Sequence, residues 1–270
     1  MIVALGFVAA LLIGGILGLL GGGGSILATP AFVYLLGVST KSSIVSSLVV
    51  VAVSSLVGGL GGIRRGEVDL RRAALFIAGS IPGSFAGGLL GGGLDDTLQM
   101  GLLAGVILIT AVAMIRRARR HDDAAAAAPS GSGDGSRARM IGGIAIGVGV
   151  GLLTGVVGAG GGFLIVPALT LFFGMTMSRA IGTSMIVIAI NSMAGLIGYV
   201  TDREIMARIA SESVGPLSLP LFLVLFTIVM TSGVMVASSM RHRIDGTTLR
   251  KLFAYFLIIV GIGIIVGIVV

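Results

Sequence analysis

Long apolar runs dominate this 270-residue chain and decide what it can fold into. Hydrophobic residues make up 56% of the sequence and charged residues 11%, against roughly 25% charged residues in an ordinary soluble domain. The mean hydropathy is +1.14. Because a helix needs about 20 apolar residues to cross a bilayer, these runs predict an all-α integral membrane protein. The predicted spans are 2–21, 42–62, 72–92, 98–115, 140–158, 179–200, 217–239 and 248–270.

Two further apolar runs, 26–38 and 163–175, are shorter, and each follows a glycine cluster and contains a proline. Glycine costs roughly 1 kcal/mol and proline roughly 3 kcal/mol in a helix interior, so these segments are predicted to be short, broken helices. Glycines at helical spacing elsewhere, such as Gly14 and Gly18 or Gly151 and Gly155, are instead predicted to let helices pack closely.

The two short runs are copies of one another. Sliding the chain on itself by 137 positions superposes Pro30 on Pro167, with 13 identities over the 39 positions between 23–61 and 160–198. The chain is therefore predicted to be an internal duplication. We place the first repeat at 1–117 and the second at 140–270. Between them, at 118–139, charge, Ala, Gly and Ser replace the apolar pattern, which indicates a flexible linker.

The distribution of Lys and Arg predicts that the second repeat is inverted. If each short run is a separate return, each half crosses an odd number of times, and the 18 basic residues divide 15 to 3 between the two sides. If 1–38 is one span, the division is only 12 to 6. The positive-inside rule then places the linker in the cytoplasm and both termini outside. A re-entrant hairpin and two complete crossings give the same parity, so both stay open.

The net charge of +7 is explained by these topology-setting loops, and no nucleic-acid partner is expected. Cysteine is absent, which excludes disulfides and thiolate metal sites. His121, Asp122 and Asp123 have no further ligand nearby in the sequence, so no metal site and no cofactor is expected. The oligomeric state is left open, with a homo-oligomer among the alternatives.

Broken helices at equivalent positions of inverted repeats predict a transporter with its binding site at the repeat interface. The helix N-termini expected at Ser25–Ile26 and Gly162–Phe163 carry partial positive charge and favour an anion. The next helix of each repeat adds a polar stripe, in which Ser46, Ser47 and Ser54 correspond to Thr183, Ser184 and Asn191. These groups either donate to a bound oxyanion or bond their own or a neighbouring helix.

Lys41 and Arg179 begin these same two helices and are predicted to lie on opposite sides of the membrane. Each is a candidate for attracting anions to one mouth of the pathway, and interfacial anchoring explains both equally well. None of the predicted spans has Asp, Glu or His in its central part. With no base or proton relay at depth, we expect no catalytic residue and no enzyme.

The motif GAGGGFLIVPAL (158–169), followed by SRAIGTSM (178–185), resembles the second-half signature of the sulfite exporter TauE/SafE family of membrane permeases. GGGGSILATPAF (21–32) and TKSSIVSSL (40–48) form a degraded first copy, in which Val45 stands at the position of Gly182. The resemblance covers essentially the whole chain. Carried over residue by residue, it implies substrate-binding roles for Gly23, Gly24, Ser25, Ser46, Ser47, Ser54, Gly160, Gly161, Gly162, Thr183, Ser184 and Asn191.

The resemblance implies a secondary transporter that exports sulfite or a small organosulfonate such as sulfoacetate across the bacterial cytoplasmic membrane. We expect one anion near the midplane, held without a full countercharge, with alternating access from movement of the two halves. The alternatives are an anion channel, a permease for another small anion, and a membrane scaffold or assembly protein that transports nothing.

Overall fold

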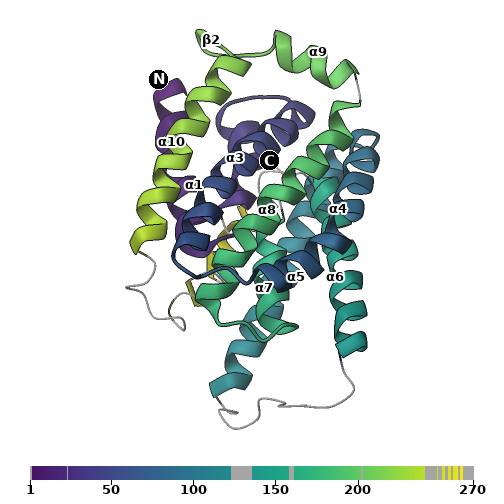
Figure 1. The fold of residues 1–270 in the computed structure, drawn as a ribbon. Helices are drawn as coiled ribbons and strands as arrows, with labels where there is room; N and C mark the ends of the chain where they lie inside the picture. Colours follow the sequence, from purple (N-terminus) through teal and green to yellow (C-terminus); the bar gives the residue numbers. More distant parts are fainter. Residues whose placement is uncertain are drawn as a thin grey trace.

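A computed structural model describes residues 2–22, 24–122, 136–157, 161–201 and 203–240, together with short stretches between 248 and 263. These residues are almost entirely helical and form a bundle (Figure 1). Its elements are α1 (Ile2–Leu20), α2 (Ser25–Pro30), the π-helix η1 (Ala31–Leu35), α3 (Thr40–Arg64), α4 (Leu70–Gly92), α5 (Asp96–Asp122), α6 (Ser136–Val157), α7 (Gly162–Leu171), α8 (Met177–Val200), α9 (Arg203–Ser211) and α10 (Leu219–Met240). The antiparallel strands β1 (Ser213–Val214) and β2 (Leu217–Ser218) join α9 to α10.

The long helices agree with an all-α integral membrane protein. Helices α1, α3, α4, α8 and α10 are long and apolar enough to cross a membrane, and each overlaps a predicted span. Helices α5 and α6 extend into the predicted linker 118–139, because Ala and Arg are strong helix formers that continue a helix beyond its apolar part. The middle of that linker, 123–135, and most of the last predicted span, 248–270, lie outside the described residues.

Helix boundaries recur at the interval of the sequence duplication. Helix α2 begins at Ser25 and α7 at Gly162, while α3 begins at Thr40 and α8 at Met177. Each pair of starts is separated by 137 positions, as in the sequence alignment. Both short apolar runs therefore begin new helices directly after their glycine clusters, which confirms the predicted starts.

Helices α1 and α10 pack side by side and run in the same direction (Figure 1). Gly14 of α1 lies against the backbone of Met230 of α10, and Gly18 lies against the backbone of Val234. A side chain at either glycine would overlap main-chain atoms of α10. The prediction that these glycines serve close helix packing is confirmed.

Helices α4 and α6 form a second pair built in the same way (Figure 1). Gly151 of α6 lies against the carbonyl oxygen of Ser80 of α4, and Gly155 lies against that of Ser84. The contacts rise together along both helices, so α4 and α6 also run in the same direction. Each of the two pairs therefore joins one helix of the predicted first repeat to one of the second.

Helices α3 and α8 lie between these pairs and run in opposite directions. Gly58 of α3 is close to the thioether of Met185, and a Cβ on Gly62 would lie 3.7 Å from Cα of Gly182. Most residues of both helices are buried, which is unusual for helices that face lipid. They form the centre of the bundle.

The antiparallel centre gives the bundle two distinguishable ends. The Lys41 end holds the start of α3, the C-terminus of α8, and α9 with the β-hairpin, which lie at the top of Figure 1. The arginine end holds the loop between α3 and α4, the start of α8, and the linker-side ends of α5 and α6 at the bottom of that view. Arg64, Arg65, Arg71, Arg72 and Arg179 belong to the arginine end.

Two glycines of α6 provide a matched test of this packing. Replacing Gly151 with Ala should destabilise the fold by about 1–3 kcal/mol, because its new methyl group would overlap the α4 backbone. Replacing Gly149 with Ala should not, because there is open space where its Cβ would stand. Thermal unfolding of both variants in detergent, followed by circular dichroism, measures the difference. Equal unfolding temperatures would show that the α4–α6 contact is not tight.

Candidate functional site

The glycine breaks before α2 and α7 meet inside the bundle. Gly22 and Gly162 are in backbone contact, so that a Cβ on either residue would overlap main-chain atoms of the other. Gly161 has φ of +74°, a left-handed conformation that residues with a side chain rarely adopt. Glycine is therefore required here both by the close approach and by the backbone conformation. We call this contact the glycine junction.

The glycine junction lies well inside the bundle, away from both ends. Gly162 is in contact with Ile188, in the middle of α8, and Gly21 is in contact with Ser184, one turn earlier. From the junction, α2 and η1 lead to the start of α3 at the Lys41 end. Helix α7 leads to the start of α8 at the arginine end. The two short helices thus begin at one place and run in opposite directions.

Two helix N-termini at one place create a local positive potential. The first N–H groups of a helix have no partner within the helix, and the helix dipole adds partial positive charge there. Neither α2 nor α7 has a side-chain cap at its N-terminus. Ser25 instead donates its hydroxyl to the carbonyl oxygen of Gly22 at 2.8 Å. An anion is the ligand that such a junction favours.

The glycines predicted as ligands do not all lie at the glycine junction. Gly161 and Gly162 form the N-terminus of α7, whereas Gly24 packs against Ile13 and Leu17 of α1. Gly23 and Gly160 lie outside the described residues. A ligand role for any of them stays a prediction.

The polar stripe of α3 faces two different neighbours. Ser47 donates to the carbonyl oxygen of Ile44 and shares a 2.8 Å hydrogen bond with Thr29 of α2. Ser54 shares a 3.0 Å hydrogen bond with Thr231 of α10. Ser46, also fully buried, has no hydrogen-bond partner for its hydroxyl. The stripe therefore connects α3 to α2 on one side and to α10 on the other.

The first part of the α8 stripe is close to the arginine end. Thr183 accepts a 2.9 Å hydrogen bond from the backbone N–H of Asp69, which fixes the loop before α4. Ser184 donates to the carbonyl oxygen of Ile181 at 2.8 Å and lies against Gly21. Of these two predicted ligands, the structure brings Ser184 to the glycine junction and gives Thr183 a contact with a loop.

Asn191 joins α8 to α4. Its Oδ1 accepts a 2.7 Å hydrogen bond from the hydroxyl of Ser80. Asn191 lies three residues after Ile188, on the same helix face, and Ile188 touches the glycine junction. The amide nitrogen of Asn191 has no hydrogen-bond partner, although the residue is only 2% exposed.

Four buried hydroxyls in the helices share this property with the Asn191 amide. Burying a polar group without a partner is costly, so each such group is a candidate for contact with water or a ligand. They come from α3, α4 and α8: Ser46, Ser55, Ser84 and Ser192. Within the described residues no group of three or more His, Cys, Asp or Glu could hold a metal ion. The chemistry available is neutral hydrogen-bond donation.

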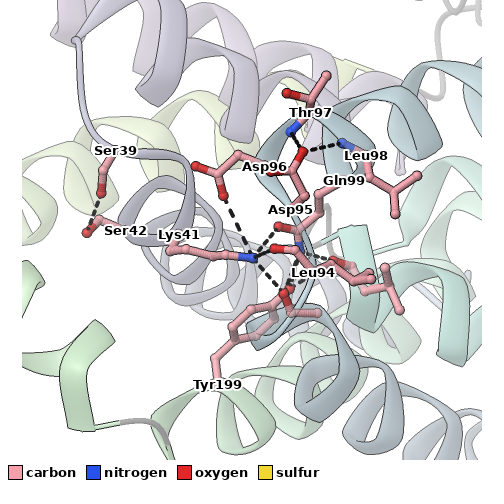
Figure 2. A network of polar contacts seen from close by, with 12 residues as sticks. Ser39, Lys41, Ser42, Leu94, Asp95, Asp96, Thr97, Leu98, Gln99 and Tyr199 are labelled. Atoms are coloured by element: carbon pink, nitrogen blue, oxygen red, sulfur yellow. Dashed lines mark hydrogen bonds and ion pairs between the residues drawn. The ribbon is translucent and has the colours of Figure 1, made fainter.

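Lys41 lies at the start of α3, and its ammonium group donates to backbone carbonyl oxygens (Figure 2). Its Nζ donates to the carbonyl oxygens of Gly91 at 2.8 Å and Leu94 at 2.6 Å, and to Oε1 of Gln99 at 3.0 Å. Asp96 lies 3.8 Å away as an ion-pair partner. The Lys41 side chain is only 15% exposed.

Gln99 extends the Lys41 contacts to two more helices (Figure 2). Its amide nitrogen donates to the Tyr199 hydroxyl at 2.7 Å and also to the carbonyl oxygen of Val156. Tyr199 donates to the same Val156 carbonyl at 2.8 Å. The network joins the start of α3 to the C-terminal ends of α4, α6 and α8, where a cation is favoured by the helix dipoles. These contacts indicate that Lys41 stabilises the packing of the helix ends. Its predicted role at a pathway mouth stays a prediction.

Arg179 differs from Lys41 in its surroundings. It begins α8 at the arginine end and is exposed. The antiparallel packing of α3 and α8 places the two cations at opposite ends of the bundle.

Sequence reasoning missed four residues that bond predicted site residues, one that extends the Lys41 network and one unpaired buried hydroxyl: Thr29, Ser80, Gln99 and Thr231, then Tyr199, and Ser84. Ser80 and Ser84 lie in GSIPGSFAGG (79–88), where small residues alternate with helical spacing, and this signal of close packing could have singled them out. The others carry no sequence signal of their own, because their partners lie far away in the chain.

The model of the family described as sulfite exporter TauE/SafE matches residues 6–264. A probable membrane transporter protein of Xylella fastidiosa (strain Temecula1) is 32% identical over 208 residues, which cover 74% of this chain and 75% of that protein. A probable membrane transporter protein of Haemophilus influenzae is 27% identical over 260 residues, 93% of both chains. The probable membrane transporter protein YdhB of Bacillus subtilis is 26% identical over 71% of this chain and 76% of its own length. No solved structure matches.

Removing the Lys41 ammonium should destabilise the fold. We expect Lys41→Ala to cost about 1–3 kcal/mol, because three neutral acceptors at helix ends lose a largely buried charged donor. Arg208→Ala is the matched control, because Arg208 is a cation of the same end with an exposed side chain. Thermal unfolding in detergent distinguishes the two variants. Equal, small losses would mean that the Lys41 network does not hold the helix ends together.

Proposed function

Because the chain belongs to the sulfite exporter TauE/SafE family, we propose that it exports small sulfur-containing oxyanions, such as sulfite or sulfoacetate, from the bacterial cytoplasm. Family membership and the names of the relatives make it a membrane transporter. The family's description supports the sulfur oxyanion as substrate. No enzymatic activity is part of the proposal.

The glycine junction is the observation that carries the anion as substrate. Two helix N-termini begin where Gly22 and Gly162 touch, deep in the bundle. Helix dipoles and unpaired N–H groups favour negative charge, and nearby Asn191 and Ser192 offer neutral donors. A site without a cationic side chain binds an anion weakly enough for release.

Helix directions support an inverted repeat. Helices α1, α3 and α10 run one way, and α4, α6 and α8 run the other way, as their glycine contacts require. The first and second long helices of the first repeat, α1 and α3, therefore run with α10, the third long helix described in the second repeat. The equivalent helices of the second repeat run with α4. This exchange is what two repeats of opposite topology produce.

Alternating access is proposed to use the two glycine-packed pairs as rigid parts. Helices α1 and α10 are locked by backbone contact, and so are α4 and α6. Small movements of these pairs relative to the central helices α3 and α8 would open the glycine junction first to one end and then to the other. The hydrogen bonds Ser54–Thr231 and Ser80–Asn191 cross these sliding interfaces.

The proposed orientation places the arginine end in the cytoplasm. The arginines flanking the α3–α4 loop and Arg179 gather there, and the positive-inside rule assigns such an end to the cytoplasmic face. The linker 118–139 would then be cytoplasmic and both termini outside.

Purified protein in liposomes tests the proposed activity. We expect saturable flux of radiolabelled sulfite or sulfoacetate, reduced about tenfold or more in Asn191→Ala, because one donor to a charged ligand is lost. Thr110→Val is the matched control, since the Thr110 hydroxyl bonds only its own helix at 2.7 Å.

The form of the flux separates the alternatives. Flux that does not saturate and exceeds carrier turnover would favour a channel. Absence of flux for both anions in wild type would contradict the proposal and favour another anion or a scaffold. Full flux in Asn191→Ala would remove Asn191 from the site.

The absence of cysteine makes the orientation directly testable. Ser211→Cys at the exposed end of α9 should react with a membrane-impermeant maleimide added to intact cells. Ser130→Cys in the linker should react only after the cells are permeabilised. The reverse labelling pattern would overturn the proposed orientation.

A further inference from the structure

The two flanking helices α4 and α10 occupy equivalent places but present different chemistry. Gly14 of α1 touches the carbonyl oxygen of Met230, and Gly151 of α6 touches that of Ser80. Gly14 and Gly151 correspond in the repeat alignment, since they are 137 positions apart. Met230 of α10 and Ser80 of α4 are therefore structural equivalents.

The next turn repeats the correspondence. Gly18 touches the carbonyl oxygen of Val234, and Gly155 touches that of Ser84, so Val234 and Ser84 are equivalents. All four residues are fully buried. Ser80 and Ser84 of α4 carry hydroxyls, whereas Met230 of α10 carries a thioether and Val234 carries only methyl groups. At this pair of equivalent positions, only α4 is polar.

Ser84 differs from those buried hydroxyls of the spans that bond their own helix. Thr110, Thr154 and Ser238 each donate to a carbonyl oxygen three or four residues earlier in their own helix. Such bonds satisfy a hydroxyl without any ligand. The Ser84 hydroxyl makes no such bond and has no other partner, although it is 0% exposed.

Unpaired donors of α4 and α8 lie close to the Ser80–Asn191 hydrogen bond that joins these two helices. The Ser80 hydroxyl holds Oδ1 of Asn191, which leaves the amide nitrogen of Asn191 without a partner. Ser84 follows Ser80 by one turn on the same face, and its carbonyl lies 3.7 Å from where a Cβ of Gly195 would stand. Ser192 adjoins Asn191 and is also unpaired. Ser84 thus lies one helical turn beyond Ser80, the partner of Asn191, and Ser192 lies one residue beyond Asn191.

We propose that the transported oxyanion binds between α4 and α8, off the axis that relates the repeats, with Ser84 and Ser192 hydroxyls and the Asn191 amide as donors. An oxyanion offers several acceptor oxygens and matches three donors without acceptors. Each chain then binds one anion, because Met230 and Val234 of α10 offer no hydroxyl at the two positions equivalent to Ser80 and Ser84, and Ser54, the counterpart of Asn191, is already bonded to Thr231. The inference rests on the proposed function and adds Ser84, a residue of the first repeat, to a site built largely by the second.

Ser84→Ala and Ser192→Ala test the site by two readouts. The KM of wild-type and variant liposomes for sulfite should rise by roughly 10- to 100-fold in each variant, as expected for a lost hydrogen bond to a charged ligand. The unfolding temperature in detergent should stay unchanged or rise, because a buried hydroxyl without a protein partner has been removed. A structural hydroxyl would give the opposite pattern. Ser238→Ala, which loses only a bond within its own helix, should leave KM unchanged.

A second readout separates this site from the proposed function. Sulfite, sulfoacetate and inorganic sulfate are added to the purified protein, and the shift in unfolding temperature is measured. A shift in wild type that disappears in Ser84→Ala supports the site, even if wild type carries no flux. An unchanged KM in both variants, or a ligand-induced shift that persists in both, overturns it. Absence of any shift in wild type with all three anions also overturns it.

Discussion

The fold depends on one contact, the meeting of two backbones at Gly22 and Gly162. Broken helices leave N–H groups unpaired, and hydrocarbon tolerates such groups only where protein covers them. Burying both breaks against each other, inside a bundle, meets this requirement for both at once. A Cβ at either glycine would force the breaks apart, so the same residues that interrupt the helices also allow the interruptions to be buried.

The flanking helices follow from the same requirement. A buried junction needs helices around it that cannot separate, and glycine contacts with the backbone provide this in α1 with α10 and in α4 with α6. Each pair joins the two halves of the chain, so neither half encloses its own broken helix. Without a hydrophobic driving force between helices in lipid, such close contact is the main source of association. The central helices α3 and α8 carry polar groups that these pairs cover, with Ser54 bonded to α10 and Asn191 to α4.

Sequence reasoning succeeded where the signal is local. Glycine clusters and prolines mark the starts of α2 at Ser25 and α7 at Gly162, because their effect on a helix does not depend on distant residues. Sequence alone missed Ser84, because the repeat alignment ends before α4. Helix α9 and the β-hairpin lengthen the second half between α8 and α10, so α4 and α10 match only in three dimensions. The burial of Lys41 was equally hidden, since its partners lie about fifty positions further along the chain.

The position of the charges bears on how the proposed anion site would release its ligand. In a medium of low dielectric constant, a cation beside an anion binds it far more strongly than in water. The largely buried ammonium group of Lys41 donates to the carbonyl oxygens of Gly91 and Leu94 at one end of the bundle. Arg179 is exposed at the other end. The glycine junction between them keeps only helix dipoles and neutral donors. In the proposed mechanism, partial charges fixed in the backbone of the glycine junction would attract an oxyanion to the neighbouring donors of α4 and α8, and because no full countercharge holds it there, the site would release it when the flanking helices move.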